Sequence, residues 1–285
     1  MLIVILGGQG NLGSQLVNVL EPDHQVLSWD REDLDVLDFS LLRSKLLAVQ
    51  PEVIINTVAY NAVDKCEEKT EQPTAFKLNR DLPGHLADIS LELGAILVHY
   101  SSDYVFNGTE EKPEFLETDT PNPLNKYGES KFWGEQEILR RVPQGLKYYL
   151  IRTSKLFGPQ GSSPFAKPSF FDIILDLSQN KKELTVVNEE LSCFTYTPDL
   201  ARSTARLIVA DSLFGIYHLV NEGSCTWYDG AVELFRLKKI KLPIRPIRSE
   251  NLARLARRPK FSVLKNTRAH RLRSWSEALR EYLNN

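Results

Sequence analysis

The sequence predicts an α/β protein built on a doubly wound parallel sheet with a smaller C-terminal lobe. Apolar, strand-like runs alternate with helix-like segments through the first half of the chain, as they do in parallel sheets with helical crossovers. A glycine-rich turn follows the first of these runs directly. Hydroxyl-bearing residues follow a later run, at the carboxyl edge where ligands bind in open α/β sheets.

Size and composition exclude several classes of protein. The 285 residues, of which 42% are hydrophobic, are ample for a full core. The formal net charge of -2 gives no reason to expect nucleic acid or an anionic membrane as a partner. The three cysteines lack the spacing of a zinc site and favour a reducing compartment. The first apolar run is too short to span a membrane, so we expect a cytoplasmic protein.

The first strand, Leu2–Leu6, leads into a turn with the spacing G-x-x-G-x-x-G. Glycines there allow a tight turn, close approach of the backbone to a pyrophosphate, and close packing of helix on strand. The helix that opens at residues 14–20 presents its N-terminus to the same anion. These features predict a dinucleotide site formed by Gly7, Gly10, Asn11, Leu12 and Gly13.

The residues after the second strand leave the choice of cofactor open. Asp30 favours the free 2'-hydroxyl of NADH, whereas Arg31 suits the 2'-phosphate of NADPH. Asp35 and Val36 follow near the expected adenine site. A helix N-cap role is equally compatible with Asp35 or with Asp38.

The alternation of strands and helices continues from there to the middle of the chain. Ala59 and Tyr60 come at the end of the third strand, where the cofactor would pass. Asn79 lies in the next helix and either reaches toward the catalytic helix, where it would help to bind the cofactor, or is only a packing or solvent residue. The expected elements are strands at Gln25–Trp29, 53–58, 93–100 and 148–152, and helices at Phe39–Val49, 73–93 and 125–140.

Beyond residue 154 the alternation weakens, which indicates a second, substrate-binding lobe. We expect a dinucleotide-binding domain over residues 1–154, to which a helix and strand return at about 198–221. Residues 155–197 and 222–285 then form the lobe. The expected elements are a helix at 165–180, a strand at Leu184–Val187, a loop at 195–199, a helix at 200–210, a strand at 215–220, and two or three helices in the tail around a basic connection at 242–259.

A reductase constellation follows the strand at 93–100. Ser101 and Ser102 are expected at its carboxyl end, and Tyr127 and Lys131, four apart, on one face of the next helix. A neighbouring ammonium should lower the pKa of Tyr127 and make it a usable general acid, while the Ser102 hydroxyl polarises a carbonyl. On its own, the Tyr-x-x-x-Lys spacing is equally typical of a solvated helix pair.

Several long motifs carry a resemblance to a known family. The chain resembles the extended short-chain dehydrogenase/reductases and, within them, the dTDP-4-dehydrorhamnose reductase family. This resemblance implies a Rossmann-type domain with a small C-terminal sugar-nucleotide lobe, NADPH or NADH as cofactor, and reduction of a nucleoside diphosphate 4-keto-6-deoxysugar. The matching motifs are the glycine turn at 7–13, VIINTVAYNAVDKCE at 53–67, SSDYVFNG at 101–108, ETDTPNPLNKYGESKFWGE at 117–135, IRTSKLFG at 151–158, and the closing RPKFSVL and SWSEALREYL.

Carried over by position, the resemblance assigns roles to individual residues. Ser102, Tyr127 and Lys131 would be the catalytic residues, with Tyr127 and Lys131 also contacting the cofactor. A homodimer is compatible with the family. The implied substrate contacts are Ser102, Asp103, Tyr104, Lys155, Thr195 and Arg258.

The chain departs from the family pattern in its substrate lobe. Lys155 stands where the family usually has a tryptophan that stacks on the sugar, and Phe261 where it has an asparagine. The substrate loop at 192–195 keeps only Thr195 of the usual motif. Lys155 would either favour a more polar sugar substituent or turn outward to solvent. Gln15 replaces the early acidic residue through which some members bind magnesium, so we expect no metal.

These departures leave a second hypothesis, from a different functional class. The chain would then be a catalytically silent, NAD(P)-binding regulatory subunit resembling the beta subunit of methionine adenosyltransferase. That relative keeps the dinucleotide fold and lacks the substrate tryptophan, as this chain does at Lys155.

Overall fold

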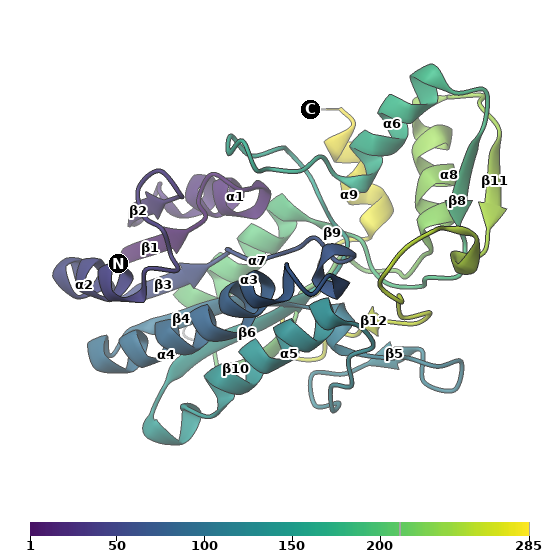
Figure 1. Ribbon diagram of the computed structural model, residues 1–285. Coiled ribbons are helices and arrows are strands. Elements are labelled where there is room, and N and C mark those ends of the chain that lie inside the picture. The colour runs from purple at the N-terminus through teal and green to yellow at the C-terminus, as the bar shows by residue number, and fades with distance from the viewer. Residues whose placement is uncertain (211, 285) are drawn as a thin grey trace.

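A parallel sheet forms the centre of the molecule in the computed structural model, which describes residues 1–210 and 212–284 (Figure 1). Every neighbouring pair of its strands runs parallel. The chain reverses its direction of travel across the sheet between β1 and β3, which creates the switch point where ligands bind in such folds. From edge to edge the strands are β10 (Gly215–His218), β6 (Lys147–Thr153), β4 (Ile96–Ser102), β3 (Val53–Asn56), β1 (Leu2–Leu6) and β2 (Gln25–Trp29).

Helices cover both faces of this sheet, which confirms the predicted doubly wound fold (Figure 1). Strand β1 shows the reason, because its side chains alternate between two apolar cores. Ile3 and Ile5 pack toward α1 (Asn11–Leu20) and α7 (Thr197–Val209). Val4 and Leu6 belong to the opposite core, which is closed by α2 (Phe39–Val49), α4 (Leu82–Leu93) and α5 (Lys126–Leu139).

The second half of the chain supplies a smaller lobe beside the carboxyl edge of the sheet (Figure 1). It has its own apolar core, in which Phe171, Phe194 and Leu234 are buried. The domain boundaries expected from the sequence stay a prediction. The elements of the lobe are α6 (Phe170–Asn180), α8 (Trp227–Lys238), α9 (Trp275–Tyr282) and the paired strands β8 (Leu184–Val187) and β11 (Ile244–Ile247), while the short pairs β7 (Leu156–Phe157) with β9 (Thr195–Tyr196) and β5 (Glu114–Phe115) with β12 (Val263–Leu264) lie between it and the sheet.

The helix expected at 73–93 is interrupted, so that prediction was wrong in its middle. A short α3 (Gln72–Phe76) passes into a π-helical turn at Lys77–Asp81 before α4 begins. The Leu82 amide donates to the Lys77 carbonyl, which accommodates one extra residue in the turn. Pro83, in the first turn of α4, has no amide hydrogen to continue a regular ladder through this region.

Local caps account for three shifted element ends. Helix α6 begins at Phe170, not at 165, because Ser169 and Asp172 form a capping box. Helix α7 begins at Thr197, where Pro198 fits the first turn, and part of the loop expected at 195–199 is strand β9. Strand β4 begins at Ile96 because Gly94 ends α4 in a left-handed conformation.

Among residues 1–210 and 212–284, no helix is both long enough and apolar enough to cross a bilayer.

Candidate active site

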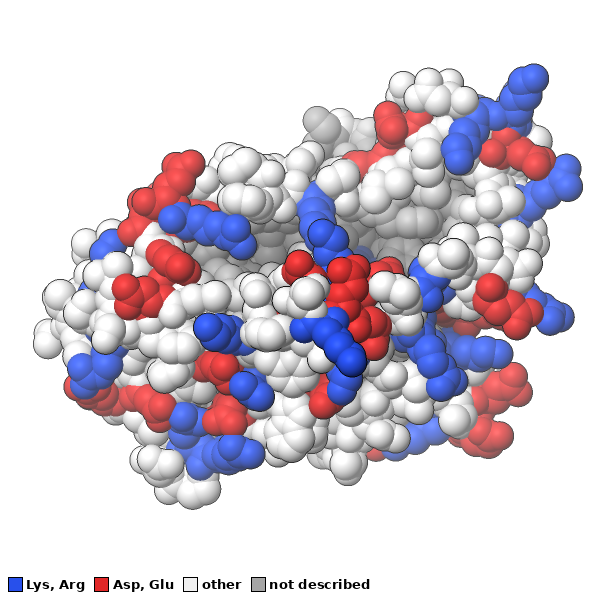
Figure 2. Space-filling model, in the orientation of Figure 1, with Lys and Arg blue, Asp and Glu red and all other residues white. Residues whose placement is uncertain are grey.

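A cavity of about 1000 Å³ lies at the carboxyl ends of β1, β3 and β4, between the sheet and the smaller lobe. Figure 2 shows the surface hollowed between these two parts of the molecule. The sheet side contributes the glycine turn and the end of β4, and the lobe side contributes Lys155, Glu190 and Trp227. The cavity therefore joins the predicted cofactor and substrate sites in one space.

The glycine turn is shaped to bring backbone close to a ligand. Gly7 has a φ of 78°, a left-handed value that favours glycine. A Cβ on Gly13 would lie 2.1 Å from the Gly7 carbonyl oxygen, so only glycine fits between turn and helix. Within the described ranges no side chain caps the N-terminus of α1, whose amide groups are therefore open to an anion. All five residues predicted for this turn line the cavity: Gly7, Gly10, Asn11, Leu12 and Gly13.

A segment from the smaller lobe closes over this turn. The Gly161 amide donates to Asn11 Oδ1 at 3.0 Å, and Asn11 Nδ2 donates to the Lys167 carbonyl at 2.8 Å. The Ser163 amide donates to the Gln9 carbonyl at 3.0 Å. Asn11 thus links the two parts of the chain in addition to lining the cavity.

The four residues predicted for the adenosine end, Asp30, Arg31, Asp35 and Val36, all line the cavity. Asp30 accepts hydrogen bonds from the Gln9 amide at 3.2 Å and the Arg31 amide at 2.8 Å. The Arg31 guanidinium lies over the Phe165 ring, 4.3 Å from its centre. Asp38, not Asp35, caps α2, because its side chain accepts from the Leu41 amide. The structure therefore leaves Asp35 at the cavity.

Two of the residues predicted to bind the cofactor do not reach the cavity, although Ala59 does. The Tyr60 hydroxyl turns away and donates to Glu71 Oε2 at 2.6 Å. Asn79 is fully buried and bonds both the amide and the carbonyl of Tyr60, and its Nδ2 also donates to Ser130 Oγ in α5. Asn79 thus contacts the catalytic helix through Ser130, but it lies behind the cavity and links that helix to the Tyr60 backbone.

The predicted catalytic residues meet at the cavity. Ser102 is the last residue of β4, and its hydroxyl donates to Asp103 Oδ1 at 3.0 Å and accepts from the Tyr104 amide at 3.2 Å. Tyr127 and Lys131 lie in the first half of α5, which Asn125 caps by accepting from the Gly128 amide. The capped helix therefore fixes the Tyr127 side chain beside the end of β4.

The expectation that Lys131 lowers the pKa of Tyr127 was wrong. Burial raises the pKa of Tyr127 well above its ordinary value, and a hydrogen bond with Ser102 only partly opposes this. The Lys131 ammonium instead donates to the Tyr100 carbonyl at 2.6 Å, and burial lowers the pKa of Lys131 to about 8. Tyr127 is consequently protonated at neutral pH, which is the form that a proton donor requires.

On the substrate side, Asp103, Tyr104, Lys155 and Arg258 line the cavity as predicted. Asp103 also accepts from Ser262 Oγ at 2.6 Å, which fastens the closing motif to the end of β4. Thr195 does not line the cavity. It is fully buried in β9, where its amide donates to the Lys155 carbonyl at 3.2 Å.

Lys155 does not turn to solvent. Its ammonium donates to the carbonyls of Glu190 at 3.0 Å and Cys225 at 3.2 Å, and lies 4.3 Å from the centre of the Trp227 ring. Burial lowers the pKa of Lys155. The Lys155 backbone has a φ of 40°, a left-handed value that bulky residues rarely adopt. This lysine is therefore held as part of the cavity wall.

Glu190, Trp227 and Arg254 are among the cavity residues that the sequence did not point to, and they carry charge or an aromatic ring on the substrate side. They come from three segments that are far apart in the chain and have no common spacing. The basic connection at 242–259 was the one available signal, and of the three residues it includes only Arg254.

Comparisons with known proteins agree with this geometry. The family model described as the RmlD substrate binding domain matches residues 1–285. The spore coat polysaccharide biosynthesis protein SpsK of Bacillus subtilis is 32% identical over 99% of this chain and 96% of its own length. A dTDP-4-dehydrorhamnose reductase of Streptomyces griseus is 34% identical over 98% of this chain and 91% of its own.

Solved structures give the same result. A dTDP-4-dehydrorhamnose reductase from Clostridium acetobutylicum has a TM-score of 0.91 at 36% identity, covering 100% of this chain and 99% of its own. The Bacillus anthracis reductase, solved in complex with NADP, has a TM-score of 0.90 at 31% identity, covering 99% and 98%. This chain therefore belongs to the family described as the RmlD substrate binding domain.

Proposed function

We propose that this protein is an NAD(P)H-dependent reductase of a nucleoside diphosphate 4-keto-6-deoxysugar, converting dTDP-4-dehydrorhamnose to dTDP-rhamnose. The observation that carries the proposal is that one cavity contains both the glycine turn and the Ser102, Tyr127 and Lys131 side chains. The names of the reductases from Streptomyces griseus and Clostridium acetobutylicum support the choice of substrate.

The chain's own residues bind and protonate the substrate. A nicotinamide cofactor bound in the cavity supplies the hydride that adds to the keto carbon. Tyr127 donates its proton to the keto oxygen, so that one hydride and one proton together convert the ketone to an alcohol. The Ser102 hydroxyl hydrogen-bonds the same oxygen, and Lys131 holds the ribose and, once the phenol begins to lose its proton, favours the phenolate.

The cofactor fits the residues that are present. The open amide groups at the N-terminus of α1 would hold the pyrophosphate, and Gly13 lets this helix pack closely against the turn that leads into it. Asp30 and Arg31 would contact the adenosine ribose, with Arg31 on the 2'-phosphate of NADPH.

Replacing Arg31 by Ala tests this reading of the cofactor. We expect Arg31→Ala to weaken NADPH binding at least several-fold, because a charge-assisted contact to the phosphate is lost, and to leave NADH binding almost unchanged. Fluorescence titration of both cofactors measures the difference. Equal losses for the two cofactors would show that Arg31 does not read the phosphate.

Lys155 makes the sugar end of the cavity more polar than an indole would. Two of its three N–H donors go to the Glu190 and Cys225 carbonyls, which leaves one for the substrate. We expect Lys155→Met to raise the KM for the sugar nucleotide about tenfold, because a charge-assisted hydrogen bond is lost. Steady-state kinetics measures KM, and NADPH affinity serves as the control. An unchanged KM would show that the Lys155 ammonium does not contact the substrate and serves only to hold the Glu190 and Cys225 segments together.

A thermal-shift comparison tests the nucleotide preference. A ligand that binds only the native state raises Tm according to its concentration and dissociation constant. With cofactor present, a dTDP-sugar should stabilise the protein more than the matched UDP-, GDP- or CDP-sugar does. A larger shift from any of the other three would overturn the choice of thymidine.

Homodimer formation and a cytoplasmic location remain proposals from the sequence and the family. Sedimentation velocity at micromolar concentration tests the first. A single species of monomer mass would contradict it.

A further inference from the structure

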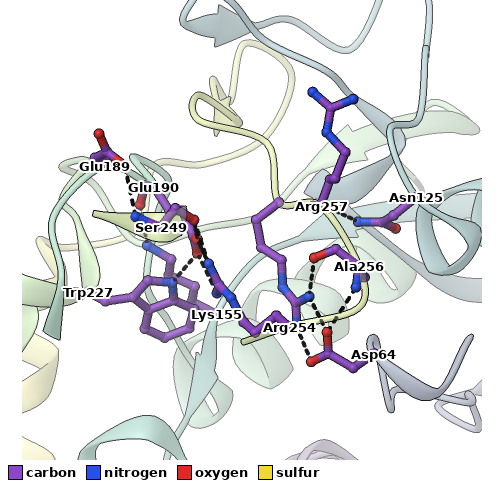
Figure 3. A network of polar contacts seen from close by, with 11 residues as sticks. Asp64, Asn125, Lys155, Glu189, Glu190, Trp227, Ser249, Arg254, Ala256 and Arg257 are labelled. Carbon is purple, nitrogen blue, oxygen red and sulfur yellow. Dashed lines mark hydrogen bonds and ion pairs between the residues drawn. The ribbon is translucent and has the colours of Figure 1, made fainter. Parts of the chain in front are cut away.

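Residues 249–258, which we name the strap, cross from the smaller lobe to the sheet side of the cavity. At one end Ser249 Oγ donates to Glu190 Oε1, and at the other the Ala256 amide donates to Asp64 Oδ1 at 3.0 Å. The Arg257 carbonyl accepts from Asn125 Nδ2 at 2.7 Å. The strap is therefore fastened to both walls, and Figure 3 shows these contacts together.

Arg254 is held by a buried carboxylate. Its guanidinium pairs with Glu190, whose side chain is 5% exposed, and donates to Ser249 Oγ. Trp227 Nε1 donates to the same carboxylate at 2.9 Å. Burial pushes the pKa of Glu190 upward, but the hydrogen bonds from Arg254 and Ser249 outweigh it, so the pKa lies below its ordinary value. Glu190 thus stays ionised and fixes the guanidinium plane.

Arg258 is held in the same manner from the opposite wall. Two of its nitrogens pair with the Asp64 carboxylate at 2.7 and 2.6 Å, and one of them also donates to the Ala256 carbonyl at 2.6 Å. The Arg258 side chain is 10% exposed. A hydrogen bond from Arg258 lowers the pKa of Asp64. Two guanidinium groups are therefore fixed at the cavity, one from each side of the strap.

Both guanidinium groups line the cavity together with Tyr104, and their charges influence the pKa of the Tyr104 hydroxyl. Burial raises the pKa of Tyr104, and the charges of Arg258 and Arg254 oppose that rise. The Tyr104 ring meets the Tyr127 ring edge-on, with their centres 5.7 Å apart. The two positive charges thus lie near Tyr104, whose ring contacts that of the expected proton donor, Tyr127.

Each guanidinium keeps donors for a ligand. Arginine has five N–H groups, and the contacts above use three on Arg254 and three on Arg258. Two remain on each side chain without a partner among the residues that the structure describes. Planar forks of this kind match the oxygens of phosphate groups.

We propose that Arg254 and Arg258 together bind the diphosphate of the sugar nucleotide, with Glu190 and Asp64 as the positioning residues that orient them. This inference rests on the proposed function, because it names the charged group that carries the sugar. The pyrophosphate of the cofactor has its own place at the N-terminus of α1, whereas the strap contacts Glu190, Asp64 and Asn125. A diphosphate held there directs the attached sugar past Tyr104 toward Tyr127.

The test compares dTDP, dTMP and thymidine by calorimetry, with NADP⁺ present. We expect Arg254→Gln and Arg258→Gln each to weaken dTDP binding at least about tenfold, since each loses charge-assisted contacts to phosphate. Thymidine and NADPH binding should stay unchanged. Unchanged dTDP affinity in both variants, or an equal loss for thymidine, would overturn the inference.

Arg257→Gln is the matched control. Arg257 is exposed, and its side chain extends away from Arg254 and Asp64 in Figure 3. Only its carbonyl takes part in the contact with Asn125, so this variant should bind dTDP as the wild type does. If Arg257→Gln weakened dTDP binding as much as Arg254→Gln and Arg258→Gln do, the effect would come from the overall positive charge of the strap. That result would contradict a specific diphosphate site formed by Arg254 and Arg258.

Glu190→Gln separates positioning from structure. It keeps the shape of the side chain and removes the charge that orients Arg254, so the KM for the sugar nucleotide should rise while kcat stays near the wild-type value. A fall in kcat with unchanged KM would contradict the positioning role.

The inference and the proposed function fail separately. If Arg254→Gln and Arg258→Gln both turned over a 4-keto-sugar at the wild-type rate with unchanged KM, the diphosphate inference would be wrong. The proposed reductase function would still hold. Arginine-dependent dTDP binding without turnover of any 4-keto-sugar would support the inference and end the proposed reaction.

Discussion

Replacing Tyr127 by Phe is expected to lower kcat for reduction of the 4-keto-sugar by about 10²- to 10⁴-fold, the range that a positioned general acid contributes. The phenol is buried and protonated, and it lies beside Ser102 at the cavity. Phenylalanine keeps the ring and its edge contact with Tyr104, so the loss is confined to the proton. Steady-state oxidation of NADPH measures kcat.

Binding measurements show whether the loss is chemical. The Kd values of NADPH and dTDP should be nearly unchanged in Tyr127→Phe. Tyr148 is a β6 residue whose side chain packs in the apolar core beneath α2, α4 and α5, so Tyr148→Phe is the matched control and should retain wild-type turnover. A Tyr127→Phe variant with undiminished kcat would remove the proposed proton donor.

The largest loss of stability is expected from breaking the buried pair of Arg152 and Glu135. Arg152 makes a two-point contact with the Glu135 carboxylate at 2.9 and 2.7 Å, and the two side chains are 2% and 0% exposed. His218 Nε2 lies 3.4 Å from Arg152, and burial together with the Arg152 charge lowers the pKa of His218 to about 4, so this imidazole is neutral at pH 7. Arg152→Ala would leave the Glu135 charge buried and unpaired.

Removing one partner of such a pair costs about 3–5 kcal/mol. Urea unfolding of Arg152→Ala should show this loss in the free energy of unfolding. Arg43→Ala is the control, because its pair with Glu92 is 53% and 44% exposed and should contribute about 0–1 kcal/mol. Similar losses in the two variants would show that burial of the Arg152 pair carries no special cost.

The pair also bears on catalysis through its position. Glu135 lies one turn after Lys131 in α5, and Arg152 is the register partner of Ser101 in β4. The contact thus fixes the catalytic helix against the strand that ends in Ser102. We therefore expect Arg152→Ala to lower turnover even under conditions where the variant remains folded.

Local signals explain what the sequence predicted well. Strands β1 and β2 and helix α2 have the expected bounds, because apolar periodicity, a glycine turn and the Asp38 cap lie within a few residues of each end. The glycine turn and the Tyr127–Lys131 spacing are also local. These signals placed both the cofactor turn and the catalytic helix at the cavity.

The errors come from effects that depend on distant parts of the chain. The Tyr60 hydroxyl points away from the cavity because it donates a hydrogen bond to Glu71. The Lys131 ammonium donates to the Tyr100 carbonyl in β4 and does not lower the pKa of Tyr127. Neither partner is marked by any spacing in the sequence. Glu190 and Arg254 meet across 64 residues of chain, so their shared site appears only once the strap is folded.

The central claim is tested most directly by turnover of dTDP-4-dehydrorhamnose with NADPH, followed by identification of the product. We predict that one NADPH is oxidised for each dTDP-rhamnose formed. A protein that binds NADPH tightly yet oxidises none with dTDP-, UDP-, GDP- or CDP-linked 4-keto-sugars, and that co-purifies with an unrelated enzyme, would contradict the account and favour a regulatory subunit.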